Sequence, residues 1–461
     1  MHNEDMTDIL LWTVNAGWIH PSLALRLLKA NLGPLENRCA IEEFTLRQSI
    51  EEKLAAITAH QCRILGISVS IWNHTGILQL LRALPTANRP IIVLGGPEAS
   101  YLGPDSPILE YADYRIIGEG EHQFRNLCTH LLCTAPSEGA FKSAYHLYTD
   151  EDLQKKLTYV ESSRGCPYRC SFCLSGMKNE DGATTGVYEF PLDEFFAQME
   201  ILIKRGAHRF KFLDRSFNHN IKRACVIMEF FLKQVESRPH DKDKTGMFVH
   251  FELVPSRIND ELLDVMKKFP ADTLRLEIGV QTLNARTKAA VKRTGDIEKE
   301  LAAISRITNE TKAIVHADLI AGLPHEDLSS FANGFDKLYA VHPCEIQLGI
   351  LKCLPGTSIR ADAGSYGIGY SPDPPYEVIQ TADITKEGMA RIKNFARFWE
   401  VIVNRNPFPD LLPTIVCGDS VFDQFMSLSD SLLSRLGRNW GLDRAVLRDA
   451  VLGCLHSDYN V

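Results

Sequence analysis

Short apolar runs alternate with amphipathic stretches along the N-terminal part of the chain. The runs of strand length are residues 9–14, 40–44, 64–70, 91–94 and 114–117. Stretches with helical spacing separate them and cover residues 21–30, 50–58 and 75–84. Strands that alternate with helices pair into a parallel sheet with helices on both faces. The pattern therefore predicts a doubly wound, Rossmann-like α/β domain over residues 1–145.

A second alternating series begins after residue 155. Its strand-like runs are residues 157–160, 209–213, 247–252, 273–278, 313–320 and 345–350. Helical stretches lie between them, so the series predicts a partial (β/α)6 barrel over residues 155–355. Barrels of this kind carry their catalytic residues at the carboxyl ends of the strands. Polar residues at those ends are therefore the candidates for chemistry.

The last part of the chain, residues 360–461, predicts a small and mostly helical domain. A loop rich in glycine and proline covers residues 360–375 and is expected to be ordered. The helical runs are residues 384–404, 419–436 and 443–456. This domain is either a cap that closes a substrate cavity or a purely structural bundle, because long helices mostly bury core residues.

The composition is that of an ordinary protein of 461 residues with a net charge of −8. Acidic and basic residues are interspersed, so no basic surface for nucleic acid is indicated. No apolar run has the length of a membrane-spanning helix, and the first residues lack the basic start of a signal peptide. The sequence therefore predicts a cytoplasmic protein with neither a nucleic-acid nor a membrane partner.

Three of the twelve cysteines are clustered and nine are isolated. In a reducing compartment, cysteines serve metal binding or packing rather than disulfides. The isolated ones are predicted to be small buried hydrophobic residues. They are Cys39, Cys62, Cys128, Cys133, Cys225, Cys344, Cys353, Cys417 and Cys454.

The clustered thiols are Cys166, Cys170 and Cys173, in a C-x3-C-x2-C array with Phe172 before the last one. Thiolates are the usual ligands of iron–sulfur clusters. A four-iron cube held by three cysteines leaves one iron open for chemistry. A structural zinc ion would need a fourth ligand, and no Cys or His follows at finger-like spacing. The array therefore predicts that these three cysteines bind a [4Fe–4S] cluster.

This array, with its aromatic residue before the third cysteine, resembles that of the radical S-adenosylmethionine (SAM) enzymes. The resemblance implies that the open iron binds the methionine moiety of SAM and that an electron from the cluster splits a carbon–sulfur bond. An external donor of the flavodoxin or ferredoxin type would supply that electron. Phe172 matches the residue that packs beside SAM in the family.

Motifs at the later strand ends resemble those of the same family in the same order. Asp214, or the main-chain carbonyls beside it, is expected to bind the ammonium group of SAM. The turn that begins at Gly322 resembles the family's Gly-Leu-Pro-Gly turn beside adenine, with His325 in place of the second glycine. The SAM contacts that the resemblance implies are Phe172, Asp214, Glu252, Glu277, Gln281, Gly322, Leu323 and Pro324.

Small-residue turns at the ends of the N-terminal strands resemble those of the cobalamin-binding domain that precedes many radical SAM enzymes. Glycine lets the backbone approach a bulky ligand closely. The cobalamin contacts that this resemblance implies are Asn15, Trp72, Asn73, Gly95, Gly96, Glu98, Gly118 and Glu119. The Asp-x-His-x-x-Gly motif that supplies a lower-face histidine is absent, and His20, after the first strand, is expected to be a helix-entry residue. Residues 360–461 resemble an uncharacterised domain found in some proteins of this type.

The resemblance implies an enzyme that transfers a carbon group from SAM to an unactivated atom of a small-molecule substrate. The leading expectation is methyl transfer through cobalamin. One alternative is a cobalamin-independent reaction with an empty N-terminal domain, in which the 3-amino-3-carboxypropyl group of SAM is transferred or the substrate is rearranged. Another is a cobalamin- or redox-responsive binding protein without catalysis.

Overall fold

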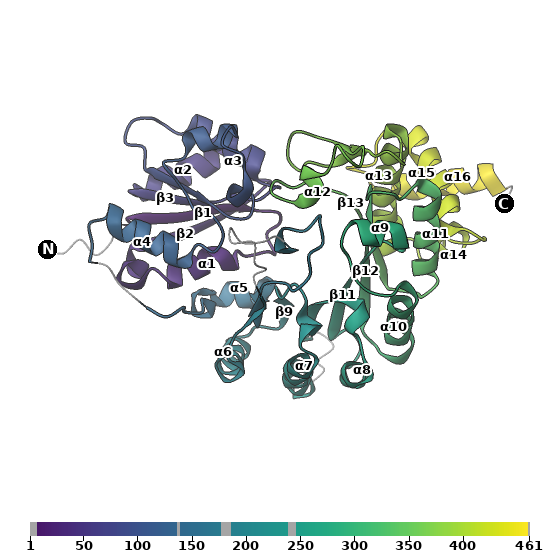
Figure 1. Cartoon of the computed structure of the whole chain (residues 1–461), viewed down its shortest axis with the longest axis horizontal. Helices are drawn as coiled ribbons and strands as arrows, with labels where there is room; N and C mark the ends of the chain where they lie inside the picture. The colour runs from purple at the N-terminus through teal and green to yellow at the C-terminus, as the bar shows by residue number, and fades with distance from the viewer. Residues whose placement is uncertain (1–6, 136–138, 177–185, 238–245, 460–461) are drawn as a thin grey trace. The chain divides into compact units, whose positions relative to one another are not determined.

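The computed structural model describes residues 7–135, 139–176, 186–237 and 246–459. The chain forms two compact units (Figure 1). Unit 1 comprises residues 1–160, 190–211 and 373–375, and unit 2 comprises residues 161–189, 212–372 and 376–461. The three domain boundaries expected from the sequence remain a prediction.

Unit 1 contains a five-stranded parallel sheet with the strand order β2-β1-β3-β4-β5. Its strands are β1 (Ile9–Asn15), β2 (Cys39–Thr45), β3 (Ile64–Ser68), β4 (Ile91–Gly95) and β5 (Tyr114–Arg115). The strand order reverses between β1 and β3, and ligands of such sheets bind beyond the carboxyl ends of the strands at this point. The predicted doubly wound fold is confirmed.

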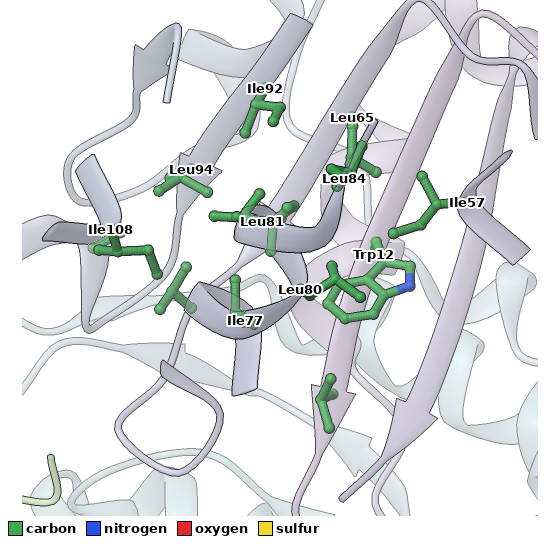
Figure 2. Close-up of a cluster of buried hydrophobic side chains, with 14 of the residues drawn as sticks. Trp12, Ile57, Leu65, Ile77, Leu80, Leu81, Leu84, Ile92, Leu94 and Ile108 are labelled. Atoms are coloured by element: carbon green, nitrogen blue, oxygen red, sulfur yellow. The ribbon is translucent and has the colours of Figure 1, made fainter. Parts of the chain in front are cut away.

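Alternate residues of β1 to β4 enter two separate hydrophobic cores, one on each face of this sheet. Leu10 and Trp12 of β1 belong to the same cluster as Leu80 of α3 (Figure 2). Ile9 and Leu11 of β1 belong to the cluster that includes residues of α1 and α4. The covering helices are α1 (Leu23–Ala30), α2 (Ile50–His60), α3 (His74–Ala83) and α4 (Glu121–Leu131).

A buried arginine joins three elements of unit 1. Nη1 of Arg26 on α1 lies 2.7 Å from the Glu43 carboxylate of β2. Its Nη2 lies 2.9 Å from the Asp152 carboxylate of α5 (Asp150–Lys155), and the guanidinium carbon lies 5.0 Å from the centre of the Tyr148 ring. Separating these partners would leave an uncompensated buried charge. The network therefore holds α5, which carries Asp152, in place against α1 and β2.

The second sheet has the strand order β13-β12-β11-β10-β9-β6, as a partial barrel of six strands requires. The strands are β6 (Thr158–Val160), β9 (Arg209–Phe212), β10 (Phe248–Leu253), β11 (Leu274–Gln281), β12 (Ile314–Ala321) and β13 (Glu345–Ile350). The intervening helices are α6 (Leu192–Lys204), α7 (Ile221–Glu236), α8 (Asp260–Met266), α9 (Ala285–Ala290), α10 (Ile297–Glu310) and α11 (Leu328–Tyr339).

Strands β10 to β13, which are parallel and lie in unit 2, place polar side chains on one face. In β11 the even-numbered apolar residues are buried and the odd-numbered residues are half-buried, and β12 shows the same alternation with the opposite parity. The buried set faces the helices, so the other set faces the inside of the partial barrel. The polar members of that inner set are His250, Glu252, Arg275, Glu277, Gln281, His316, Asp318, Glu345 and Gln347.

The C-terminal helices form an aromatic core with α11. They are α13 (Lys386–Trp399), the π-helical turn η8 (Glu400–Asn404), α14 (Leu412–Ile415), α15 (Val421–Leu436) and α16 (Arg444–Tyr459). The Phe395 ring of α13 stacks on Phe422 of α15 with centroids 4.7 Å apart, and Phe335 of α11 lies 4.8 Å from Trp399. Aromatic pairs in these geometries stabilise a core beyond the area that they bury. Whether this region also caps a substrate cavity stays a prediction.

An asparagine side chain pairs with the backbone of the last barrel strand. Nδ2 of Asn404 donates to the Ile346 carbonyl oxygen at 3.1 Å, and the Ile346 N–H donates to its Oδ1 at 3.3 Å. A strand at the edge of a sheet otherwise presents unpaired backbone groups. The Asn404 amide therefore takes the place of a neighbouring strand at this point of β13.

The isolated cysteines follow the sequence prediction only in part. Cys39, Cys62, Cys128, Cys225, Cys353 and Cys454 are buried, as expected. The prediction is wrong for Cys133, Cys344 and Cys417, which are exposed. They lie in turns or loops between elements, where no apolar periodicity buries them. In the parts of the chain that the structure describes, no helix is long and apolar enough to cross a membrane.

Candidate active site

The cysteine loop follows β6 along the chain, after one more short strand. Residues Ser163–Arg164 (β7) pair with Tyr188–Glu189 (β8), and Gly165 follows directly before Cys166. Gly165 has φ +93°, and a Cβ there would lie 2.5 Å from the Gly186 carbonyl oxygen. Only glycine fits this position, so the backbone that delivers the first thiol depends on it.

Backbone hydrogen bonds hold the loop from two sides. The Ser171 N–H donates to the Val291 carbonyl oxygen at 3.0 Å, just after α9. The Ile359 N–H donates to the Ser171 carbonyl oxygen at 3.0 Å, at the start of α12 (Ser358–Ala361). The segment after β13 thus holds the cysteine loop in place.

The thiols lie in a partly buried and partly cationic environment. Burial raises the pKa of Cys166 and of Cys170, while the Arg293 guanidinium acts to lower that of Cys170. Nη1 of Arg293 lies 3.9 Å from Sγ of Cys170. The described residues include no group of three or more His, Cys, Asp or Glu side chains arranged to hold a single metal ion. Ligands of an iron–sulfur cluster bind different iron atoms, so a cluster does not need that convergence.

Asp214 is buried at the base of this loop, after β9. Its carboxylate accepts hydrogen bonds from the Ser162 N–H at 2.9 Å, from the Ser162 hydroxyl at 2.7 Å and from the Ser163 hydroxyl at 2.6 Å. Burial nevertheless raises the pKa of Asp214. These bonds connect Asp214 to the chain that enters the cysteine loop; its contact with SAM stays a prediction.

The predicted residues Glu252 and Glu277 lie beside each other on neighbouring strands. They are register partners between β10 and β11, and Glu277 is in turn the partner of His316 on β12. The Glu277 carboxylate lies 3.1 Å from Nε2 of His250. Arg215 Nη1 lies 4.0 Å from the Glu252 carboxylate. A row of ionisable side chains therefore runs across these strands on the inner face.

The turn after β12 is tied to the end of β11. The hydroxyl of Thr282 donates to Oε1 of Glu326 at 2.6 Å, and Asn284 Nδ2 donates to the His325 carbonyl oxygen at 3.4 Å. Glu326 is 1 % exposed, and burial raises its pKa to about 7. Of the predicted SAM contacts in this turn, Gly322 has φ +90°, and Leu323 and Pro324 are buried.

Two of the remaining predicted SAM contacts occupy different surroundings. Phe172 is half-buried within the cysteine loop, and Gln281 ends β11 with φ +71°. A non-glycine residue in this backbone region is uncommon and often marks a functional site. Sequence reasoning missed Thr282, Glu326 and Arg293; the raised pKa of Glu326 and the proximity of Arg293 to a cluster thiol are signals that only the fold provides.

The strand ends of unit 1 carry the predicted glycine turns. Gly96 has φ +97°, and a Cβ there would lie 2.7 Å from the Val69 carbonyl oxygen, so this turn requires glycine. Gly118 has φ +75° with open space where a Cβ would project, and Gly95 is nearly as open. Glu119 is exposed beside Gly118.

The polar residues predicted as cobalamin contacts are bonded within unit 1. Asn73 is buried and donates from Nδ2 to the Val14 carbonyl oxygen at 3.0 Å. Glu98 is buried with Oε1 2.9 Å from Nδ1 of His74. Nδ2 of Asn15 donates to Glu43 at 3.0 Å. These side chains shape the turns, and their contact with cobalamin stays a prediction.

Large apolar side chains at the same strand ends are instead exposed. They follow the ends of β1, β2, β3 and β5 and are Trp18, Ile19, Leu46, Trp72 and Ile117. Exposed apolar groups gathered at one edge of a sheet are typical of a binding surface. His20 is a helix-entry residue, as expected, and its Nδ1 lies 2.7 Å from the Tyr159 hydroxyl.

Sequence models of known families match three successive parts of the chain. The radical SAM superfamily matches residues 160–338, and the B12 binding domain matches residues 10–128. This is a radical SAM enzyme with a B12-binding domain. A family described only as a protein of unknown function (DUF4080) matches residues 364–431 of the enzyme. No curated protein matches it in sequence.

Solved structures of cobalamin-dependent radical SAM enzymes share the fold of this enzyme. The methyltransferase TsrM from Kitasatospora setae, with tryptophan and a SAM analogue bound, has a TM-score of 0.58 and 16% identity over 80% of this chain and 79% of TsrM. The cobalamin-dependent enzyme OxsB, with aqua-cobalamin and SAM bound, has a TM-score of 0.62 and 12% identity over 98% of this chain and 80% of OxsB. At these identities the likeness concerns the fold.

The donors present in the enzyme fit the cofactors that its two domains imply. The radical SAM domain implies a [4Fe–4S] cluster and SAM, and the B12-binding domain supports cobalamin. The loop of unit 2 supplies three thiols, which suit iron. Unit 1 offers open glycine turns beside exposed apolar side chains, which suit the flat, largely apolar corrin ring.

Proposed function

We propose that this enzyme transfers a methyl group from SAM, by way of cobalamin, to an unactivated atom of a small-molecule substrate. The observation that carries the proposal is the pairing of two cofactor domains in one chain whose fold is shared with the methyltransferase TsrM. When bound, the cluster supplies the electron that cleaves SAM, and cobalamin carries the methyl group.

The residues of unit 2 would bind and orient SAM. Cys166, Cys170 and Cys173 would hold the cluster, with Asp214 fixing the entry to their loop. The ends of β10 and β11 would face the ribose and amino groups through Glu252, Glu277 and Gln281. The turn from Gly322 to Pro324 would contact adenine, and its buried side chains exclude water from that side.

The side chains on the inner face of the partial barrel favour a polar substrate. Its strands present carboxylates, imidazoles and a guanidinium beside a few apolar side chains. The guanidinium of Arg275 lies over the Phe248 ring at 4.2 Å, which holds one cation at a fixed place. A small metabolite with several hydrogen-bonding groups suits this lining better than a hydrocarbon. An external flavodoxin- or ferredoxin-like protein would donate the electron.

The products of SAM test this proposal. Protein reconstituted without oxygen with iron, sulfide and hydroxocobalamin would be incubated with SAM, a reductant and extracts of small metabolites. Methyl transfer predicts S-adenosylhomocysteine together with 5′-deoxyadenosine, and a methyl label from SAM in a new small molecule. Methylthioadenosine as the SAM product would instead support transfer of the 3-amino-3-carboxypropyl group, and no SAM turnover would support a binding protein.

A further inference from the structure

The segment that follows the barrel folds back onto the turn after β12. Residues 366–372 and 376–389 lie in the region matched by the family of unknown function and belong to unit 2 with the barrel strands that they touch. Their contacts fall on His325 and Gly322, which flank Leu323 and Pro324. This segment therefore meets the turn at both ends.

His325 has a backbone conformation that needs support. Its φ is +61°, in the left-handed region where a side chain costs about 1–2 kcal/mol relative to the right-handed form. The radical SAM resemblance has glycine here, which would adopt this conformation without that cost. The enzyme thus places a strained residue at the end of this turn.

Two residues of the segment contact His325 directly. The His325 N–H donates to Oδ2 of Asp383 at 3.1 Å. The Tyr366 ring meets the His325 ring edge-on, with centroids 5.5 Å apart and an interplanar angle of 84°. An acceptor on the backbone N–H and a ring against the side chain both favour the observed conformation of His325.

The other end of the turn has no room for movement towards the segment. A Cβ on Gly322 would lie 3.0 Å from Cε of Met389 and 3.3 Å from Cγ1 of Val378. Both side chains are buried, with Met389 on α13 and Val378 on β15 (Val378–Gln380). Gly322 is therefore packed directly against the C-terminal region.

Asp383 is itself held in place by the backbone. The hydroxyl of Thr381, which is buried, accepts from the N–H groups of Asp383 at 3.1 Å and Ile384 at 2.9 Å. The Val378 N–H donates to the Leu351 carbonyl oxygen at 2.8 Å, just beyond β13. The carboxylate is thus presented from a turn that is anchored to the barrel, which preorganises it.

We propose that residues 366–372 and 376–389 form a positioning element for SAM, in which Asp383 holds the turn from Gly322 to His325 in the shape that binds the cofactor. Asp383 acts through His325 and does not touch SAM. The inference rests on the proposed role of this turn in binding SAM. On this proposal the region of unknown function contributes to SAM binding. A separate lid or an independent helical bundle would not.

Binding of SAM to four variants tests this role. Cluster-loaded, unreduced protein would be dialysed against labelled SAM, and the thermal transition and iron content would be measured in parallel. Asp383→Ala removes the acceptor of one hydrogen bond and should raise the Kd for SAM about three- to tenfold, with iron content and melting temperature unchanged. Asp383→Asn keeps an acceptor oxygen and should stay within about twofold of the wild type.

Two further variants separate this effect from general damage. Tyr366→Ala removes the ring contact with His325 and should weaken SAM binding in the same direction. Asp430→Ala is the matched control. Asp430 on α15 forms an exposed ion pair with Arg391 on α13 at 2.8 Å, and neither residue contacts the turn from Gly322 to His325. The Kd of Asp430→Ala should equal that of the wild type.

The outcomes distinguish this inference from the proposed function. Unaltered SAM affinity in both Asp383→Ala and Tyr366→Ala, beside a wild type that binds SAM, would overturn the positioning role alone. Equal losses in Asp383→Ala and Asp383→Asn would also overturn it, because the hydrogen bond would not be the cause. A cluster-loaded wild type that fails to bind SAM would overturn the proposed function and this inference together.

Discussion

The two parallel sheets of this enzyme end their strands in different ways. At the rim of unit 1, polar side chains such as Asn73 and Glu98 turn inward into hydrogen bonds, and apolar ones such as Trp18 and Trp72 are left exposed. In the partial barrel, ionisable side chains lie along the inner face of the strands. The first sheet offers apolar surface at its strand ends, and the second offers charge along its inner face.

This difference shows how parallel sheets of the same kind can suit two different cofactors. Ligands of parallel sheets bind beyond the carboxyl ends of the strands in both cases. A large flat ligand gains affinity from apolar contact area and from glycine turns that leave room for it. Such a ligand needs few precisely placed polar partners. SAM carries an ammonium group, a carboxylate and a sulfonium, and such a ligand needs partners that are fixed in place before it binds.

Removing a cluster ligand is the strongest way to break the barrel side of this comparison. Cys→Ala at position 166, 170 or 173 should abolish the absorbance of the four-iron cluster and all SAM cleavage, because each thiolate binds one iron. Iron content, visible absorbance and SAM products measure this. Cys344→Ala is the control, since this cysteine is exposed and isolated; full iron retained in any of the three ligand variants would refute the assignment.

A variant of Asp214 tests whether the cysteine loop depends on the buried carboxylate that holds its entry. Asp214→Ala leaves Ser162 and Ser163 without their acceptor, at a cost of roughly 1–3 kcal/mol for each buried donor. We expect lower cluster content and weaker SAM binding together. Iron analysis and equilibrium dialysis report both, and a variant with full cluster and unchanged SAM affinity would show that the loop is held by its other contacts.

Trp72 tests the apolar rim of unit 1. Trp72→Ala should weaken cobalamin binding about tenfold through lost aromatic contact. It should cost only about 1 kcal/mol of stability, because the side chain is 51% exposed and its indole N–H donates one hydrogen bond, to the Val14 carbonyl oxygen at 3.1 Å. Titration of the protein with hydroxocobalamin, followed by absorbance, gives the affinity. Trp440→Ala, which removes a 66% exposed tryptophan of unit 2, is the matched control; equal cobalamin affinity in both variants would remove Trp72 from the proposed site.

Glu326 gives the smallest expected effect, one of stability against pH. Burial favours the neutral carboxyl in the fold and raises its pKa from 4.5 to about 7. The wild type should therefore lose stability as pH rises from about 4.5 to 7, by at most about 3 kcal/mol. Glu326→Gln should remove this loss, so its melting temperature should exceed that of the wild type at pH 8 by more than at pH 5. Parallel melting curves would contradict the assignment.

Much of this arrangement could be predicted from the sequence because it is local. Strand length and helical spacing predict the elements of both sheets, since burial follows the period of each element. The cysteine array needs only eight residues of chain, from Cys166 to Cys173. Gly96 is recognisable as a turn residue because no other residue type adopts its backbone conformation so readily.

What could not be predicted depends on contacts between distant segments. Glu326 meets Thr282 across 44 residues, and Asp214 meets Ser162 across 52. No pattern along the chain indicates which donor will satisfy a given carboxylate, because that depends on how the strands register. Glu98 illustrates the same limit, since no pattern along the chain indicates its pairing with His74.

The Asn404 amide that pairs with β13 has a practical consequence for anyone shortening this chain. A fragment that stops after the sixth strand would leave the Ile346 backbone N–H and C=O open to water or to another molecule. Bare strand edges recruit foreign strands, so such a fragment would tend to self-associate. The radical SAM domain of this enzyme is therefore best produced with its C-terminal helices attached.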